Sequence, residues 1–181
     1  MDNAPIASYP SSPPSPWIPM RYHMRRADKE IKDPEEIKSV LKETQYMTLA
    51  MVKDGEPYLV SLSHGYDEER NSLYFHSAGE GKKLDYMRAS PVVWGQVILD
   101  HGYAVKECTH KYVTVMFKGR VRLLESLEEK RRAMRTMINQ LDPNPEPLLK
   151  RLLDSDGLKK TAVGEIRLDE VTGKKTPGIV V

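Results

Sequence analysis

The sequence predicts a mainly β domain with peripheral helices, in which the strands form a small antiparallel barrel. Six segments rich in apolar and β-branched residues have the length of strands, and short turn sequences separate several of them. Helices do not alternate regularly with these segments, as they would in a parallel sheet. We expect the strands at 46–52, 57–63, 72–76, 91–99, 112–124 and 161–168.

The N-terminal region differs from the rest of the chain in composition. Residues 1–20 contain six of the 13 prolines, with serines between them, and show no apolar periodicity. Such a segment buries too little apolar surface to fold by itself. We therefore expect a proline-rich, disordered or extended arm at 1–22 and one folded domain at 23–181, because 181 residues are too few for two comfortable cores.

A first helix is expected at 34–44. Asp33 can accept hydrogen bonds from its free amides, Pro34 suits its first position, and Glu36 can complete a capping box. One face of this helix is apolar and should lie on the core: Ile37, Val40 and Leu41.

Several turns are recognisable between the strands. Asp54-Gly55 stands between the first two strands and is typical of a tight hairpin. The polar segment 67–71 is expected to form a hairpin between the second and third strands. Gly119 can bend the long fifth strand, and a turn is expected at 171–174 after the last strand.

Three further helices are expected at 82–89, from Ser126 to about Leu141, and at 148–153. Ser126 and Glu129 have the spacing of a capping box at the start of the second of these. The side chains expected to face inward are Leu84, Met87, Ala133, Met134, Met137, Ile138 and Leu141.

The composition limits the possible functions. With 39% hydrophobic and 30% charged residues and a net charge of +2, the chain has no global field that would favour nucleic acid or membrane partners. No apolar run approaches a membrane span, no secretory signal is recognisable, and a single cysteine fits a reducing compartment, so we expect a cytoplasmic protein. No metal site is expected, because Cys108, His101 and His110 lack the spacing of a ligand set.

The stretch 57–84 carries the clearest chemical signal. Gly79 and Gly81 leave backbone amides open to a ligand, and Lys82 and Lys83 add two positive charges where a helix begins. A phosphate group would suit this turn. The alternative is that both lysines belong to the solvated first turn of a surface helix.

Motifs of several enzyme classes are absent. The sequence has no GxGxxG after a first strand, no GxxxxGK(S/T), no GxSxG and no HExxH. His64 and His76 lie in strand-like segments, and each could act as a general acid or base or only hold the structure through a hydrogen bond. Strand alternation places His76 on the face of Tyr74, opposite Phe75.

Five segments follow one another between Met24 and Lys175 in a specific order and spacing: MRRADKEI, LAMVKDGEPYLVSLSHGYD, LYFHSAGEGKKLDYMRASP, YVTVMFKGRVRLLESLEEK and IRLDEVTGKK. As a set they resemble the flavin-binding split-barrel family related to pyridoxamine 5′-phosphate oxidase, most closely its nitroimidazole-resistance branch. The resemblance implies a six-stranded antiparallel split barrel of the FMN-binding type. It also implies a homodimer with one FMN per subunit in a cleft at the interface.

The resemblance also assigns residues to the flavin. The strand Leu59, Val60, Ser61 and Leu62 would lie along the isoalloxazine ring, and His76, Ser77 and Ala78 would lie beside the ring and ribityl chain. Lys82 and Lys83 would meet the phosphate, and Thr114 would reach the flavin from the opposite subunit.

The sequence departs from the family pattern in two places. Position 61 is Ser and the C-terminal tail lacks the Trp and Arg with which the related oxidases hold their substrate, so pyridoxamine phosphate is not the expected substrate. Val113 and Phe117 stand where the nearer branch usually has an Arg and a Gly, which would reshape the pocket.

The expected function is therefore that of an FMN-dependent oxidoreductase that reduces nitroaromatic, 5-nitroimidazole-like, or similar small acceptors. His76 is the candidate catalytic residue, as a proton donor beside the flavin. The alternatives are a non-catalytic flavin-binding or sensor protein, or a split-barrel relative that uses deazaflavin or haem.

Overall fold

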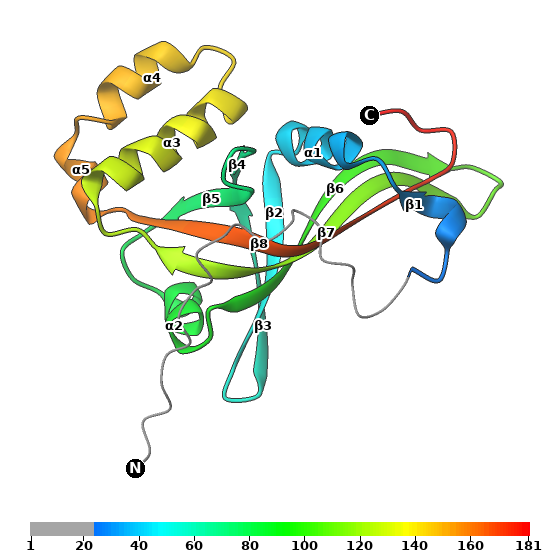
Figure 1. Cartoon of the computed structure of the whole chain (residues 1–181), viewed down its shortest axis with the longest axis horizontal. Coiled ribbons are helices and arrows are strands. Elements are labelled where there is room, and N and C mark those ends of the chain that lie inside the picture. Colours follow the sequence, from blue (N-terminus) through cyan, green and yellow to red (C-terminus); the bar gives the residue numbers. More distant parts are fainter. Residues whose placement is uncertain (1–23) are drawn as a thin grey trace.

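The computed structural model describes residues 24–181, so the arm expected at 1–22 lies outside the described residues. Within 24–181 the chain forms eight strands, five α-helices and one short 3-10 helix, Ala27–Lys29 (Figure 1). The strands are β1 (Glu30–Ile31), β2 (Tyr46–Lys53), β3 (Glu56–Ser63), β4 (Gly65–Asp67), β5 (Ser72–Ser77), β6 (Val92–Ala104), β7 (Thr109–Leu123) and β8 (Ala162–Lys175). The helices are α1 (Pro34–Glu43), α2 (Lys82–Ala89), α3 (Leu127–Leu141), α4 (Pro145–Leu152) and α5 (Asp156–Lys160).

All eight strands belong to one antiparallel sheet, in the order β3-β2-β6-β7-β8-β5-β4, with β1 paired to β8. The two ends of this order, β3 and β4, follow each other in the chain and are separated by His64 alone. The sheet therefore curves until its ends are joined by the backbone, but it is not closed by hydrogen bonds. The mainly β, antiparallel prediction is confirmed; the expected strand count of six omits the short β1 and β4.

The hairpin expected at 67–71 is confirmed, but it joins the short strand β4 to β5, because β3 pairs with β2 and the chain bends at His64 before β4 pairs with β5. One prediction about a turn is wrong. The expected turn at 171–174 is part of β8, which runs on to pair with β7 and β1. Gly173 serves close packing here, since a Cβ atom at this position would lie 2.8 Å from the Cβ of Ile31.

The predicted N-caps and the tight turn after the first long strand are confirmed, whereas the Glu36 carboxylate accepts from Lys175 and completes no capping box among the described residues. Asp54 and Gly55 form the two-residue turn between β2 and β3, both with positive φ. Asp33 accepts a hydrogen bond from the Glu35 amide at the start of α1, and Ser126 accepts one from Glu129 at the start of α3. The expected bend in β7 is a register shift between Lys118 and Gly119.

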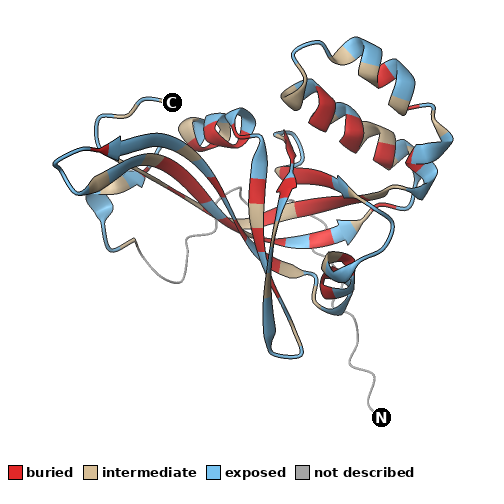
Figure 2. Ribbon diagram, turned by 180° about the vertical axis from the view of Figure 1, so that it is seen from behind, coloured by how far each residue is buried: buried red, intermediate tan, exposed pale blue. Residues whose placement is uncertain are grey.

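The apolar side chains form two cores. The larger core lies inside the curved sheet and under α1 and α2, and includes all three residues expected on α1. The smaller core lies between the other face of β5 and the helices α3, α4 and α5 (Figure 2). Tyr74 belongs to this smaller core and Phe75 to the larger one, as strand alternation requires.

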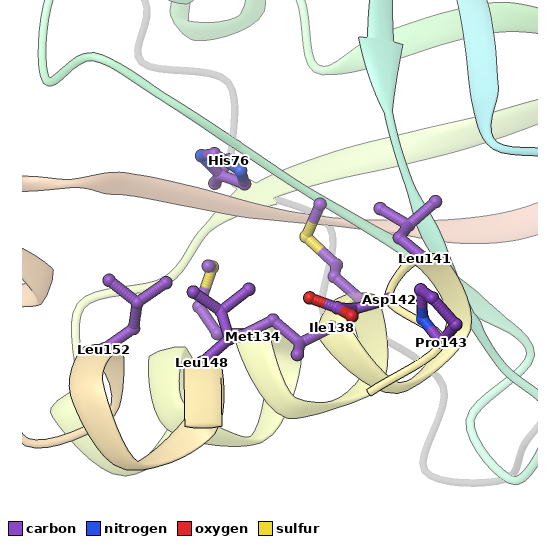
Figure 3. Close-up of a pocket in the computed structure, with 9 residues that line it drawn as sticks. His76, Met134, Ile138, Leu141, Asp142, Pro143, Leu148 and Leu152 are labelled. Carbon is purple, nitrogen blue, oxygen red and sulfur yellow. The ribbon is translucent and has the colours of Figure 1, made fainter. Parts of the chain in front are cut away.

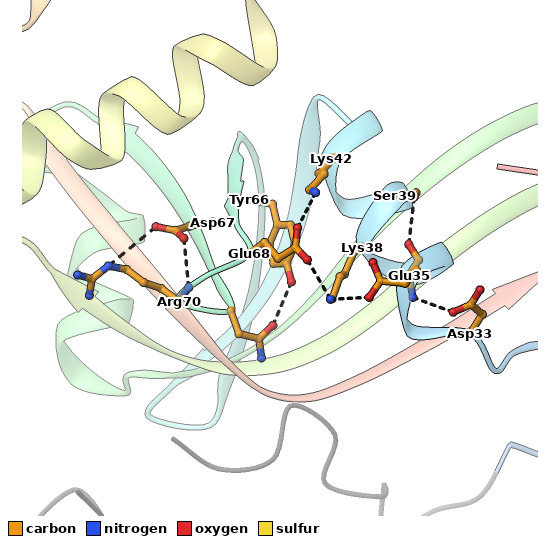
Figure 4. A network of polar contacts seen from close by, with 10 residues as sticks. Asp33, Glu35, Lys38, Ser39, Lys42, Tyr66, Asp67, Glu68 and Arg70 are labelled. Carbon is orange, nitrogen blue, oxygen red and sulfur yellow. Dashed lines mark hydrogen bonds and ion pairs between the residues drawn. The ribbon is translucent and has the colours of Figure 1, made fainter. Parts of the chain in front are cut away.

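A cluster of charges ties α1 to the turn between β4 and β5 (Figure 4). Lys38 donates to Glu35 at 2.6 Å and to Glu68 at 2.9 Å, and Lys42 donates to Glu68 at 2.7 Å. The two lysines lower the pKa of Glu68 to about 2. This cluster is exposed and is best explained as a link between the two elements.

Candidate functional site

The segment Gly79 to Lys83, here called the basic turn, leads into the first residues of α2 and lies against the beginning of β3. Lys82 donates to the Glu56 carboxylate at 3.3 Å, and its ammonium lies 4.9 Å from the ring centroid of Tyr58 and 5.5 Å from that of Tyr86. The Glu56 carboxylate raises the pKa of Lys82 above its ordinary value. A cation at this helix terminus is thus held in place by a carboxylate and two aromatic rings.

The N-terminus of α2 is open to an anion. Gly81 precedes the helix with φ 133, a conformation that favours glycine, and no side chain accepts a hydrogen bond from the first amides. Lys83 follows at the second helical position and is partly exposed. Free amides, the positive end of the helix dipole and two lysines together suit a phosphate group.

The strand β3 is the edge of the sheet and pairs with β2 alone. Its side chains alternate: Val60 and Leu62 turn towards the larger core, whereas Leu59 and Ser61 lie on the opposite side. Ser61 shares a hydrogen bond of 3.0 Å with Thr48 on β2. The four residues 59–62 are expected to line the flavin ring, but their side chains alternate between the two faces of β3. A ring that lay against Leu59 and Ser61 would therefore contact Val60 and Leu62 through their backbone atoms.

An exposed apolar surface lies on the side of β2, β3, β6 and β7 that faces away from the larger core, and we call it the outer face. Its large side chains remain exposed: Leu59 by 65%, Trp94 by 42%, Ile98 by 43% and Met116 by 36%. A shallow cavity of about 190 Å³ lies in this surface, lined by Thr48, Ala50, Leu59, Trp94, Gly95, Gln96 and Met116. Exposed apolar patches of this kind mark interaction surfaces.

Thr114 also lies on the outer face, directly opposite Ile98 in the register of β6 and β7. Its side chain is buried, and its hydroxyl donates to the Val97 carbonyl at 2.8 Å. The donor is therefore used within the sheet, and the hydroxyl oxygen can still accept a hydrogen bond.

His76 lies elsewhere, in a cavity of about 380 Å³ between β5 and the pair α3 and α4 (Figure 3). The imidazole is exposed at the cavity, and loss of hydration lowers its pKa below the ordinary value. Within residues 24–181, no hydrogen bond or ion pair joins His76 to another side chain. Its neighbour on the same strand face, Tyr74, donates to Asp67 at 3.1 Å, and burial raises the pKa of Tyr74 to about 12.

The structure thus groups the predicted site residues into three places. Lys82 adjoins the start of β3, and Lys83 follows it in α2. Leu59, Ser61 and Thr114 lie on the outer face, and His76 faces α3 and α4. Ser77 and Ala78 lead from β5 towards the basic turn, and Ser77 donates to the Ala78 carbonyl at 3.0 Å.

Sequence reasoning missed three further residues near these places: Glu56, Tyr86 and Asp142. Glu56 holds Lys82, Tyr86 lies beside it, and Asp142 lines the His76 cavity. Glu56 is the first residue of β3, directly after a tight turn, and Asp142 belongs to a proline-rich connection, so neither follows a pattern that would single it out. The segment with Cys108 forms the tip of the β6–β7 hairpin, where His110 bonds Asp100 at 2.7 Å.

Known proteins share this fold. A family model described as pyridoxamine 5′-phosphate oxidase matches residues 33–175. No curated protein matches the chain in sequence. In the part of the chain that the structure describes, no helix combines the length and the apolar character needed to cross a membrane.

Three solved structures illustrate the similarity. A candidate 5-nitroimidazole antibiotic resistance protein from Bacteroides thetaiotaomicron is 25% identical with a TM-score of 0.69, over 80% of this chain and 85% of that one. An FAD-binding protein from Mesorhizobium loti is 26% identical with a TM-score of 0.61, over 82% and 97%. A flavocytochrome from Azotobacter vinelandii shares the fold at 19% identity, with a TM-score of 0.73 over 87% and 73%.

Proposed function

The chain belongs to the pyridoxamine 5′-phosphate oxidase family, and from this premise we propose that it is an FMN-binding oxidoreductase that reduces nitroaromatic or similar small acceptors. The observation that carries the proposal is the position of the open, basic N-terminus of α2 beside the free edge of β3. The FAD-binding relative and the candidate nitroimidazole resistance protein, at 26% and 25% identity, support the choice of cofactor class and acceptor.

The residues present fit a flavin mononucleotide. Lys82 and Lys83 would hold its phosphate together with the amides of the turn that contains Gly79 and Gly81. The unpaired backbone edge of β3 offers donors and acceptors to the polar edge of a flat ring. When bound, flavin supplies reversible two-electron chemistry, and the protein supplies binding and orientation.

We propose further that the active form is a homodimer that shares its cofactor sites. The support is the outer face, where four large apolar side chains stay exposed, a state that a second copy of the chain would relieve. Thr114 lies on this face, and because its hydroxyl already donates to Val97, it would meet the partner's flavin only as a hydrogen-bond acceptor. A cytoplasmic location also remains part of the proposal, and the single cysteine supports it.

His76 would donate a proton during turnover. Reduction of a nitro group to a nitroso group consumes two electrons and two protons and releases water. His76 would supply one proton to the departing oxygen, and both electrons and the other proton would come from the bound, reduced cofactor. Because its pKa is lowered, His76 is neutral at pH 7, and its protonated, donating form increases as the pH falls.

The first test concerns the cofactor. The absorbance spectrum of the purified protein should show flavin bands, and titration should show a preference for FMN over riboflavin. Exchange of Lys82 and Lys83 for Ala should weaken FMN binding by about tenfold or more, since charge-assisted bonds to the phosphate are lost, and leave riboflavin unchanged. Exchange of Lys150 and Arg151 for Ala, which removes two exposed charges on α4, is the matched control. An unchanged preference for FMN, or a haem spectrum, contradicts the proposal.

The second test concerns turnover. The protein is reduced with NADPH without oxygen, and reoxidation by a 5-nitroimidazole is followed by absorbance across pH. The parent should react faster as the pH falls below neutrality, and a His76→Asn variant should lose this dependence and about 100-fold in rate. A flavin that neither donor nor acceptor changes would make the protein a flavin carrier or sensor.

A further inference from the structure

The cavity beside His76 lies between β5, α3 and α4, and neither Lys82 nor the outer face contributes to its lining. Its floor and walls come from the facing sides of α3 and α4, and β5 passes over it with the imidazole of His76 (Figure 3). With a volume of about 380 Å³, it is large enough for a small organic molecule.

The walls are apolar and adaptable. Seven of the nine lining residues carry apolar side chains: Met134, Met137, Ile138, Leu141, Pro143, Leu148 and Leu152. Methionine side chains follow the shape of a ligand and make favourable contacts with aromatic rings. A flat aromatic molecule therefore suits this cavity better than a sugar or a phosphate compound.

Two polar groups interrupt the apolar lining, and only one carries a charge at neutral pH. Asp142 follows the last residue of α3, and its carboxylate accepts a hydrogen bond from the Asn144 amide at 2.9 Å, which fixes its position. Within residues 24–181 it has no ion pair with a cation. Neutral His76 can donate one hydrogen bond and accept one.

We propose that this cavity binds the substrate's aromatic body and selects molecules that carry a protonated amine, which would pair with Asp142. The inference rests on the proposed function in one respect, since it names the class of acceptor that the flavin would reduce. A carboxylate without a cation at the edge of an apolar cavity favours a cationic ligand over a neutral one of the same shape and opposes an anionic one.

The test uses the purified full chain and two probes of equal shape, 1-naphthylmethylamine and 1-naphthylmethanol. Binding is followed by the NMR signals of ¹³C-methyl methionine. Met134 and Met137 line the cavity, whereas Met116 lies on the outer face and reports binding there. We expect both probes to shift the first two signals and the amine to bind about fivefold more tightly.

Two variants decide the role of the carboxylate. Asp142→Asn should weaken the amine by about fivefold and leave the alcohol unchanged, whereas Asp156→Asn, an equal charge loss at an exposed site, should change neither. Leu148→Trp should fill the cavity and weaken both probes by about tenfold. Shifts at Met116 instead of Met134 and Met137, or equal effects of Asp142→Asn on both probes, overturn the inference.

These measurements need no turnover, so they separate the two proposals. A protein that binds the amine at Met134 and Met137 but carries no flavin refutes the proposed function and keeps the binding site. A flavin enzyme whose cavity ignores both probes keeps the function and refutes the site.

Discussion

Replacement of Gly95 by Ala should destabilise the protein because a phenylalanine ring occupies the place of the missing side chain. Gly95 on β6 lies directly opposite Phe117 on β7. A Cβ atom at Gly95 would lie 2.2 Å from Cζ and 2.4 Å from Cε2 of Phe117, and 2.9 Å from Cδ2 of Leu49. Phe117 and Leu49 are both fully buried, so neither can move into solvent.

The expected cost follows from these contacts. Overpacking of a dense core costs about 1–3 kcal/mol, and a collision with two buried side chains belongs at the upper end. Exchange of Gly for Ala in a strand recovers about 0.5–1 kcal/mol of backbone entropy. The net loss should be about 2 kcal/mol, which lowers the melting temperature of a domain of this size by about 4–8 °C. Urea denaturation should show a lower midpoint with an unchanged slope.

Two further variants show whether the ring is the cause. Phe117→Leu removes the ring atoms that meet the new methyl group. The free energy of unfolding lost in the double variant should therefore be smaller, by about 1 kcal/mol or more, than the two single losses added together. Gly157→Ala is the control, because a Cβ atom there has only an ordinary contact, 3.6 Å from the Ser155 hydroxyl, and α5 should gain stability. Additive effects at positions 95 and 117, or equal effects of the two glycine variants, would refute the reasoning.

Three other outcomes can be measured. Asp33→Ala should cost about 1 kcal/mol in thermal unfolding through loss of the α1 cap, whereas Asp33→Asn should cost little; equal losses would contradict the capping role. Burial lowers the pKa of His64, so the unfolded chain binds more protons below about pH 6.5, and stability should fall with pH in that range and fall less in His64→Gln; parallel curves would count against this. Glu56→Gln should release Lys82 and strengthen FMN binding about threefold without an effect on riboflavin, and weaker FMN binding would rule out competition between carboxylate and phosphate.

Caps and tight turns could be predicted because their causes lie within a few neighbouring residues. Asp33 and Ser126 bond amides two or three positions away, and Asp54-Gly55 needs only its own backbone angles. The strand boundaries could not, since they depend on distant partners. Thr172-Gly173 resembles a turn in sequence, yet Gly173 is there to admit Ile31 from the other end of the chain.

The same distinction applies to the residues of the candidate site. Lys82 and Lys83 could be predicted because they directly follow glycines in the sequence, and in the structure Lys82 lies against β3. Asp142 could not be found, because its relation to His76 arises only when α3 and α4 fold over β5.

The position of β8 at the end of the chain affects how the protein folds during synthesis. It pairs with β1, β5 and β7, and it is synthesised after all of them. The hairpins β2–β3 and β6–β7 can form as soon as they leave the ribosome, but β5 and β7 keep exposed edges until Ala162–Lys175 emerges. Until then the nascent chain presents unpaired strands that invite aggregation, so we expect it to depend on chaperones during synthesis and expect truncation within β8 to yield insoluble protein.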